Sequence, residues 1–179
     1  MTDSDGLIGF QSRENWLGEP VLTLADIWPE NPTAMIVGLN PAPPSVHVCH
    51  YYQGRSGRGQ LMRLVRCGLI GEPSGGYFEE AALARGVGFT DIVKRPSIGE
   101  ADVSAAEIDH GRTVLEAALA AHSVPLVICV FRQPVEALLG VAGAPGFQEA
   151  RTSWGGRVFR MPGPFERRDT ADAVMRTLG

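Results

Sequence analysis

Asn40 directly follows an apolar run, and its amide is the first side chain in this sequence whose position suggests chemistry. The run Ala34-Met35-Ile36-Val37 has the composition of a buried strand, and it continues into Gly38-Leu39-Asn40-Pro41. Ligands bind beyond the carboxyl ends of the strands in open α/β sheets, so an amide at this edge can orient water or substrate. Asn and Pro also favour turns for backbone reasons alone, which is the alternative interpretation of the motif.

Aromatic residues, glycines and arginines are interleaved in the segment that follows Asn40. It has the sequence His50-Tyr51-Tyr52-Gln53-Gly54-Arg55-Ser56-Gly57-Arg58-Gly59 and leads into an apolar stripe at helical spacing, Leu61, Leu64 and Val65. An aromatic on a loop offers a flat face to a base, glycine allows close backbone approach, and Arg binds phosphate. The segment therefore predicts a nucleotide-binding surface beside Asn40.

Asp91 is a second candidate for chemistry, because it lies near the end of a run predicted to form a strand beside the first one. A carboxylate at that position can activate water or stabilise a cationic sugar. The structural alternative is that Thr90 and Asp91 cap a turn, or that Asp91 pairs with Lys94 or Arg95.

The charge of the chain is unevenly distributed. A formal net charge of −4 argues against a simple nucleic-acid binder, since such domains are usually basic. Residues 41–71, however, carry four arginines and no acidic residue, and residues 151–179 carry six arginines against three acidic residues. The positive charge thus lies on the segments with the candidate motifs, which suits a phosphate-binding face, although a solvated arginine face has the same composition.

The motif around Asn40 resembles that of a known family. The order Gly38-Leu39-Asn40-Pro41, with Ser45 four positions after the Pro and Tyr52 twelve positions after the Asn, is similar to the mismatch-specific uracil/thymine DNA glycosylases of the uracil-DNA glycosylase superfamily. The segment 88–96, GFTDIVKRP, resembles the family's strand that ends in an Arg-Pro turn. Residues 126–131 and 157–164 fall where its later strands and last DNA-contacting loop lie, so the resemblance covers residues 34–179.

The resemblance implies a monofunctional DNA glycosylase that flips uracil, and other deaminated or mismatched bases, out of DNA. Hydrolysis of the N-glycosidic bond leaves an abasic site, the first product of base excision repair. The reaction passes through an oxocarbenium-like sugar, so the enzyme stabilises a departing base anion and places a water on the opposite side. Asn40 would orient that water through its carbonyl oxygen, and Asp91 is the second catalytic candidate. The predicted base-binding residues are Gly38, Leu39, Ser45 and Tyr52, with Tyr52 stacking on the flipped base.

The chain departs from the family at Met161-Pro162-Gly163-Pro164-Phe165. Gly163 and Phe165 stand where the family usually has small polar residues, so the selection of the opposite base is not carried over. Phe165 can act as an apolar wedge between bases or can be a core aromatic. The predicted DNA-binding residues are His50, Arg58, Gly163, Pro164, Phe165 and Arg167.

Alternating strand and helix patterns predict a three-layer α/β/α sandwich with a short, mainly parallel, four-stranded sheet, as in uracil-DNA glycosylases. Ser104 and Glu107 form a capping box for a helix that ends near His122, Pro134 lies in the first turn of a helix that stops at Gly140, and Asp169 is a candidate cap for the last helix. The predicted strands are Ala34–Leu39, Gly88–Val93, Leu126–Phe131 and Arg157–Met161.

Length and composition predict a single glycosylase domain, residues 34–179, with residues 1–33 as an N-terminal extension packed on it. The acidic start, the absence of a long apolar run and three widely spaced cysteines lead us to expect a cytoplasmic protein with reduced thiols. We expect no metal and no cofactor, no membrane partner, a monomer, and DNA with uracil or a mismatched or deaminated base as the partner.

Two other function classes stay open at the level of sequence. A nucleoside-hydrolysing or nucleotide-binding enzyme could use a similar scaffold, but the chain has no P-loop, and residues 54–59 do not have the spacing of a dinucleotide-binding loop. A damaged-DNA binding module that has lost turnover is the other alternative, because Gly163 and Phe165 depart from the family pattern.

Overall fold

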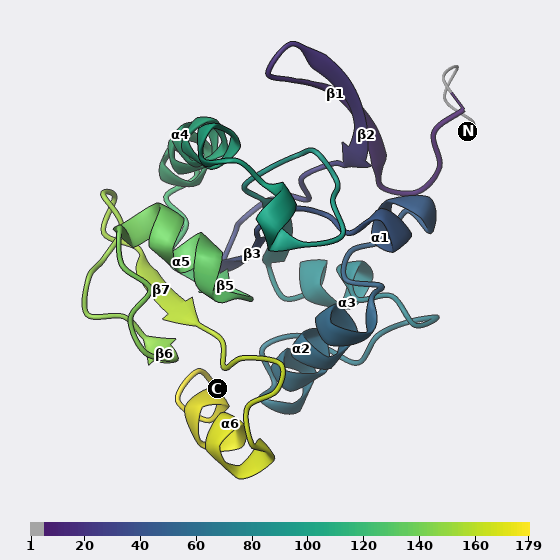
Figure 1. The fold of residues 1–179 in the computed structure, drawn as a ribbon. Coiled ribbons are helices and arrows are strands. Elements are labelled where there is room, and N and C mark those ends of the chain that lie inside the picture. The colour runs from purple at the N-terminus through teal and green to yellow at the C-terminus, as the bar shows by residue number, and fades with distance from the viewer. Residues whose placement is uncertain (1–5) are drawn as a thin grey trace.

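Strand β3 (Ala34–Gly38) lies inside a five-stranded sheet of order β4-β3-β5-β7-β6 (Figure 1). The computed structural model describes residues 6–179. Strands β4 (Val87–Asp91), β5 (Leu126–Cys129) and β7 (Arg157–Arg160) run parallel to β3, and β6 (Gly146–Phe147) is antiparallel to β7. The predicted α/β fold with a mainly parallel sheet is confirmed, with the two-residue β6 as a fifth strand.

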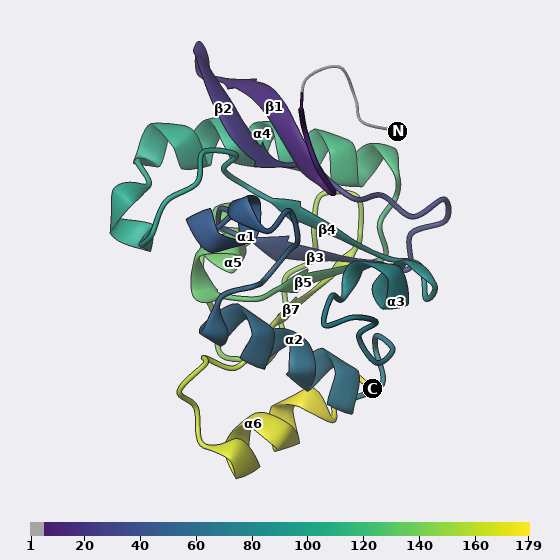
Figure 2. The same cartoon turned by 90° about the vertical axis from the view of Figure 1, so that its right-hand side faces the viewer.

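Helices cover both faces of the sheet. Successive side chains of a strand point to opposite faces, so the apolar side chains of the buried strands form one cluster on each face. Ile36 belongs to one cluster, whereas its neighbours Met35 and Val37 belong to the other. Figure 2 shows the sheet edge-on between these layers. The cluster around Ile36 packs on α2 (Arg55–Arg66), α3 (Glu79–Leu83) and α6 (Arg168–Met175), and the opposite cluster packs on α4 (Ala105–Ala121) and α5 (Arg132–Leu139).

An antiparallel hairpin, β1 (Gln11–Trp16) and β2 (Glu19–Leu24), precedes the sheet and lies on the side of α4 (Figure 2). Trp16 is buried, and its indole N–H donates to the carboxylate of Glu107 in α4. Downstream of the hairpin, Ile27 pairs with Phe89 and covers the open edge of β4. Residues 1–5 of the predicted N-terminal extension lie outside the described residues.

The capping box of α4 is confirmed, since the Ser104 hydroxyl accepts from the Glu107 N–H and the Glu107 carboxylate accepts from the Ser104 N–H. Gly140 ends α5 in the left-handed conformation, as its sequence position indicates. The predicted cap of α6 is wrong. The helix begins at Arg168 and Arg167 is its N-cap, so Asp169 lies inside the first turn and pairs with Arg167. No helix of residues 6–179 is both long enough and apolar enough to cross a membrane.

Candidate active site

A cavity of about 410 Å³ opens at the carboxyl ends of β3, β4 and β5. Its wall consists of the loops that follow these three strands, the short helix α1 (Pro43–His47) and the N-terminal turn of α2. Asn40, Tyr52 and Asp91 all line it, so the parallel register brings together residues that are far apart in sequence. This is the edge at which open α/β sheets bind ligands.

The amide of Asn40 has a fixed orientation. Its Nδ2 donates to the carbonyl oxygen of Arg95 at 2.9 Å and to Oγ of Ser97 at 2.7 Å. A carbonyl oxygen only accepts hydrogen bonds, so the amide nitrogen must face Arg95. No donor among residues 6–179 reaches Oδ1 of Asn40, which leaves that oxygen to accept a hydrogen bond from a molecule in the cavity.

Asp91 is the last residue of β4 and its carboxyl also faces the cavity. The side chain is 5% exposed, and burial raises its pKa to about 7, although nearby Lys94 acts in the opposite direction. The alternative pairing of Asp91 is wrong, because the Lys94 ammonium binds the carboxylate of Asp26 at 2.5 Å and the Arg95 guanidinium binds Glu107. Lys94 reaches Asp91 only at its backbone oxygen, at 2.8 Å. The structure thus places an unpaired carboxyl in the cavity.

Gly38 makes room for this arrangement. A Cβ on Gly38 would overlap Oδ1 of Asp91 and lie 2.8 Å from Oη of Tyr52. The Tyr52 ring packs near Tyr51 and Phe89, with ring centroids 6.1 and 6.3 Å away, and its backbone has a positive φ of 56°. Because Gly38 has no side chain, the side chains of Asp91 and Tyr52 can both occupy the space beside it.

Leu39 and Ser45, two of the predicted base-binding residues, are buried and line the cavity. The Ser45 hydroxyl accepts from the N–H of Gln53, and its backbone oxygen accepts from the N–H of His50. Ser45 thus holds the loop that carries Tyr52.

The first turn of α2 faces the same cavity through Arg55, Ser56 and Gly57. Gly54 is the N-cap, no side chain caps this end, and the first turn has no acidic residue. The first N–H groups of a helix have no acceptor within the helix, and the helix dipole favours an anion there. This end of α2 suits a phosphate group.

Two of the predicted DNA-binding side chains are engaged within the protein. His50 stacks on Tyr77 and contacts the Glu79 carboxylate through Nδ1 at 3.2 Å. Arg58 donates to Gln53 and to the backbone oxygen of Gly76. Neither residue lines the cavity, and their DNA-binding roles stay predictions.

Arg63 is the clearest exception to a phosphate-binding face on α2. It is 9% exposed, and its guanidinium donates to the backbone oxygens of Pro162 and Gly163 and to the side chain of Gln60. Arg63 therefore fixes the loop after β7. The positive charge of Arg63 therefore does not indicate a phosphate site, because a guanidinium can donate its hydrogen bonds to backbone carbonyls as well as to phosphate.

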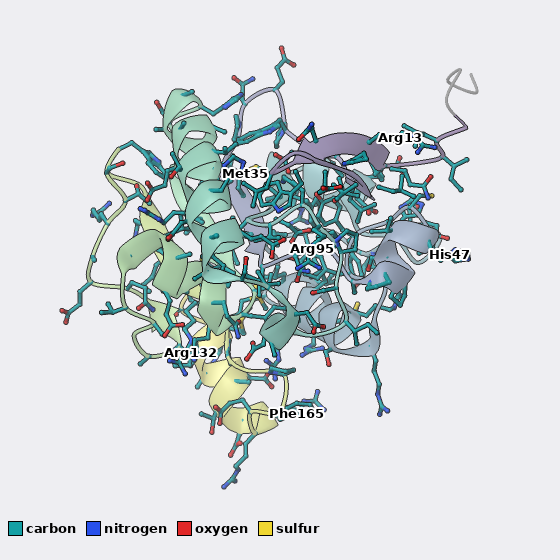
Figure 3. All side chains as sticks on the ribbon, turned by 45° about the horizontal axis from the view of Figure 1, so that its top comes forward. Arg13, Met35, His47, Arg95, Arg132 and Phe165 are labelled. Carbon is teal, nitrogen blue, oxygen red and sulfur yellow. The ribbon has the colours of Figure 1, made fainter. Side chains whose placement is uncertain are left out.

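The loop after β7 projects Phe165 outward. Figure 3 shows this side chain at the periphery of the molecule, in the loop that leads to α6. Phe165 is 94% exposed, so the core-aromatic alternative is wrong. The side chain of Arg167 is also exposed. Gly163 and Pro164 lie between the anchored Pro162 and this exposed tip, and none of the four residues lines the cavity.

The loop after β4 holds functional candidates that sequence reasoning missed. Ser97 binds the Asn40 amide and also donates to the backbone oxygen of Gly99. Ile98 is 93% exposed, although it lies at the cavity wall. The only sequence signal was the Arg95-Pro96 turn, which indicates that the chain leaves the strand but not that it returns to Asn40.

Arg95 is held in turn by Glu107, which accepts from Nε at 2.7 Å and from Nη2 at 2.9 Å. The bond from Arg95 lowers the pKa of Glu107 to about 2. Figure 3 labels Arg95 in this central region of the molecule. The ion pair connects the loop under Asn40 to the start of α4. Among residues 6–179, no three His, Cys, Asp or Glu side chains come together in the manner of a metal site.

The model of the uracil DNA glycosylase superfamily matches residues 25–173. The matched segment includes Asn40, Asp91 and every other residue of the cavity wall except Leu24, and it extends past Phe165. No curated protein matches the chain.

Proposed function

The chain belongs to the uracil DNA glycosylase superfamily, and on that premise we propose that it is a monofunctional enzyme that excises uracil from DNA. One observation carries the proposal: an oriented amide and an unpaired carboxyl, Asn40 and Asp91, face one cavity of nucleotide size. Deaminated and mismatched bases other than uracil are further candidate substrates. The products are a free base and an abasic site in DNA.

Asn40 orients the attacking water in this mechanism. Both hydrogen bonds of its amide nitrogen go to the loop after β4, so rotation of the side chain would break two contacts. Its free Oδ1 accepts a hydrogen bond from water and directs a water lone pair toward C1′ of the flipped nucleotide. An amide is not a base, so this step relies on position and on a leaving group that departs as an anion.

Asp91 supplies the negative charge. In its ionised form it accepts a proton from water or stabilises the cationic sugar of the transition state. A pKa of about 7 means that both protonation states are populated near neutral pH. We expect excision to increase as the pH rises through this value, because the ionised form is the active one.

The flipped nucleotide has matching contacts elsewhere in the cavity. Tyr52 offers its ring to the base, and Leu39 adds an apolar wall. The free N–H groups at the start of α2 accommodate the phosphate. Phe165, Arg167 and Ile98 are exposed on the loops after β7 and β4, where they suit contacts with the surrounding duplex.

A strand-cleavage assay tests the proposal. Labelled oligonucleotides carry uracil, hypoxanthine, xanthine or thymine opposite each base, in single and double strands, and alkali reveals abasic sites. We expect cleavage at uracil and none with Asn40→Ala. Binding of lesion DNA without cleavage would instead indicate a damage-binding module. Release of base from free nucleosides, with none from DNA, would indicate a nucleoside hydrolase.

A further inference from the structure

The hydroxyl of Tyr52 is a buried group without a hydrogen-bond partner. It is one of three such side-chain atoms among residues 6–179, together with Oγ1 of Thr23 and Nε of Arg160. An unpaired buried hydroxyl costs about 1–3 kcal/mol, so its position requires an explanation. Stacking on a base does not supply one, because a phenylalanine ring would stack as well without this cost.

The hydroxyl cannot turn elsewhere. Gly57 lies against the Tyr52 backbone and ring, where even a Cβ on Gly57 would be 3.0 Å from Cδ1. The left-handed backbone of Tyr52 is itself uncommon for a bulky residue. At the far end of the ring, Oη lies 2.8 Å from the place where a Cβ on Gly38 would stand, and Oδ1 of Asp91 lies against the same place. The clamped ring thus directs its hydroxyl to the place where the Asp91 carboxyl lies.

We propose that the Tyr52 hydroxyl is a positioning donor for Asp91, which hydrogen-bonds the carboxylate once that group is ionised and holds it for the reaction. This inference rests on the proposed function of Asp91. Both oxygens already lie against the place that a Cβ on Gly38 would occupy, so the proposal requires only a rotation of the carboxyl about its own side-chain bonds. Burial and, to a smaller extent, the nearby Asp91 carboxylate raise the pKa of Tyr52 well above its usual value. The hydroxyl therefore keeps its proton and can donate a hydrogen bond.

The other charged and titratable groups nearby do not replace this donor. Lys94 is bound to Asp26 and to the Asp91 backbone oxygen, and it reaches no Asp91 carboxylate oxygen. Glu14 from β1 faces Lys94 and Asp26, and burial raises its pKa.

Two more titratable side chains lie near Tyr52. The Tyr51 hydroxyl already donates to the backbone oxygen of Ala25. Cys129 is fully buried, and burial raises the pKa of its thiol, which keeps it uncharged. Among the described residues, Tyr52 is therefore the side-chain donor that has no acceptor at this floor of the cavity.

Tyr52→Phe tests the inference, because it removes the hydroxyl and keeps the ring. The kcat/KM for uracil excision is measured from about pH 5 to about pH 9. We expect the midpoint of the rising limb to increase by about one pH unit, since a hydrogen bond to a charged group is lost. Activity should fall by about tenfold below the midpoint and converge with the unmodified protein at high pH. A profile that superimposes on that of the unmodified protein, or that falls by one factor at every pH, would overturn the inference.

Tyr51→Phe is the matched control, since it removes the neighbouring hydroxyl that donates to Ala25. We expect it to leave the midpoint in place. A carbon-13 titration of the Asp91 carboxyl gives a readout without activity, and its midpoint should increase by about one pH unit in Tyr52→Phe. An unmoved carboxyl titration refutes the Tyr52 inference. A moved titration in a protein that does not excise uracil supports the contact and refutes the proposed function instead.

Discussion

Gly38 and Asp91 are partners in the parallel register of β3 and β4, and the Asp91 carboxyl lies where a side chain on Gly38 would begin. The Asp91 carboxyl can thus take its position only because the residue beside it on the neighbouring strand is a glycine.

Gly38→Ala should therefore disturb both the fold and the site. The added Cβ overlaps Asp91 and crowds Tyr52, and overpacking of this kind costs about 1–3 kcal/mol. Chemical unfolding and an excision assay measure the two effects. Gly59→Ala is the control, because nothing lies within 4 Å of a Cβ there, and helix propensity predicts a gain of about 0.5–1 kcal/mol. Equal stability of the two variants would contradict the crowding.

Asn40→Ala should lower kcat for excision by several hundredfold, roughly the effect of removing a preorganised catalytic group. Ser97→Ala keeps Asn40 but removes one of its two acceptors, so we expect a smaller loss of about fivefold to tenfold in kcat. DNA binding should be little changed in both, as measured with an uncleavable uracil analogue. A Ser97→Ala enzyme with unaltered kcat would show that Arg95 alone orients the amide.

Asp91→Asn should stabilise the protein at alkaline pH. Burial raises the Asp91 pKa from 3.8 to about 7, so between these values the folded protein holds a proton that the unfolded chain has released. Stability is therefore lost as the pH rises through this window. Above it, Asp91→Asn should increase the free energy of unfolding by roughly 2–4 kcal/mol, with little effect below about pH 4. Asp109→Asn, at an exposed position on α4, is the matched control.

Arg63 and Arg167 should separate folding from DNA binding. Arg63→Ala removes one donor from each of the backbone oxygens of Pro162 and Gly163, which keep Gln60 Nε2 and the Glu166 N–H, and should cost about 1–3 kcal/mol of stability. Arg167→Ala should leave stability unchanged and reduce the salt dependence of DNA binding by about one unit of slope, if Arg167 contacts one phosphate. An unaltered slope in Arg167→Ala would assign that arginine to a solvated surface.

Phe165→Ala and Ile98→Ala should impair excision from duplex DNA more than from single strands. Each removes an almost fully exposed apolar side chain beside the proposed DNA path. A wedge contributes only where a base stack must be opened, and we expect a duplex-specific loss of about tenfold for Phe165→Ala. Val141→Ala removes an exposed apolar side chain elsewhere and should change neither rate. Equal losses on both substrates would argue against a wedge.

The sequence predicted the sheet well because buried parallel strands are nearly continuous apolar runs. All four predicted strands exist, each with its end displaced by one or two residues. The hairpin β1 and β2 was missed, since polar residues such as Gln11, Arg13 and Glu14 do not give a clear apolar run. The strand β6 has only two residues, Gly146 and Phe147, which is too short to give a recognisable strand pattern.

The candidate site was predictable as far as strand ends determine it. Asp91 ends β4, and Asn40 lies just after the adjacent parallel strand β3, so their proximity follows from the register of the two strands. The contacts that orient them did not follow from the sequence. Ser97 is 57 positions away from Asn40 in the sequence, and no sequence pattern indicates that contact. The left-handed backbone of Tyr52 could not be predicted either, because glycine is the usual residue in that conformation.

Glu107 joins three segments, since it accepts hydrogen bonds from the Trp16 indole, the Arg95 guanidinium and the Ser104 cap. Arg95 in turn carries the carbonyl that holds the Asn40 amide. Trp16 lies upstream of residues 25–173, the segment that the superfamily model matches. A minimal fragment cut to that segment would keep Asn40, Asp91 and Tyr52 and yet lose one of the anchors behind them, so an engineer should count the hairpin as part of the working enzyme.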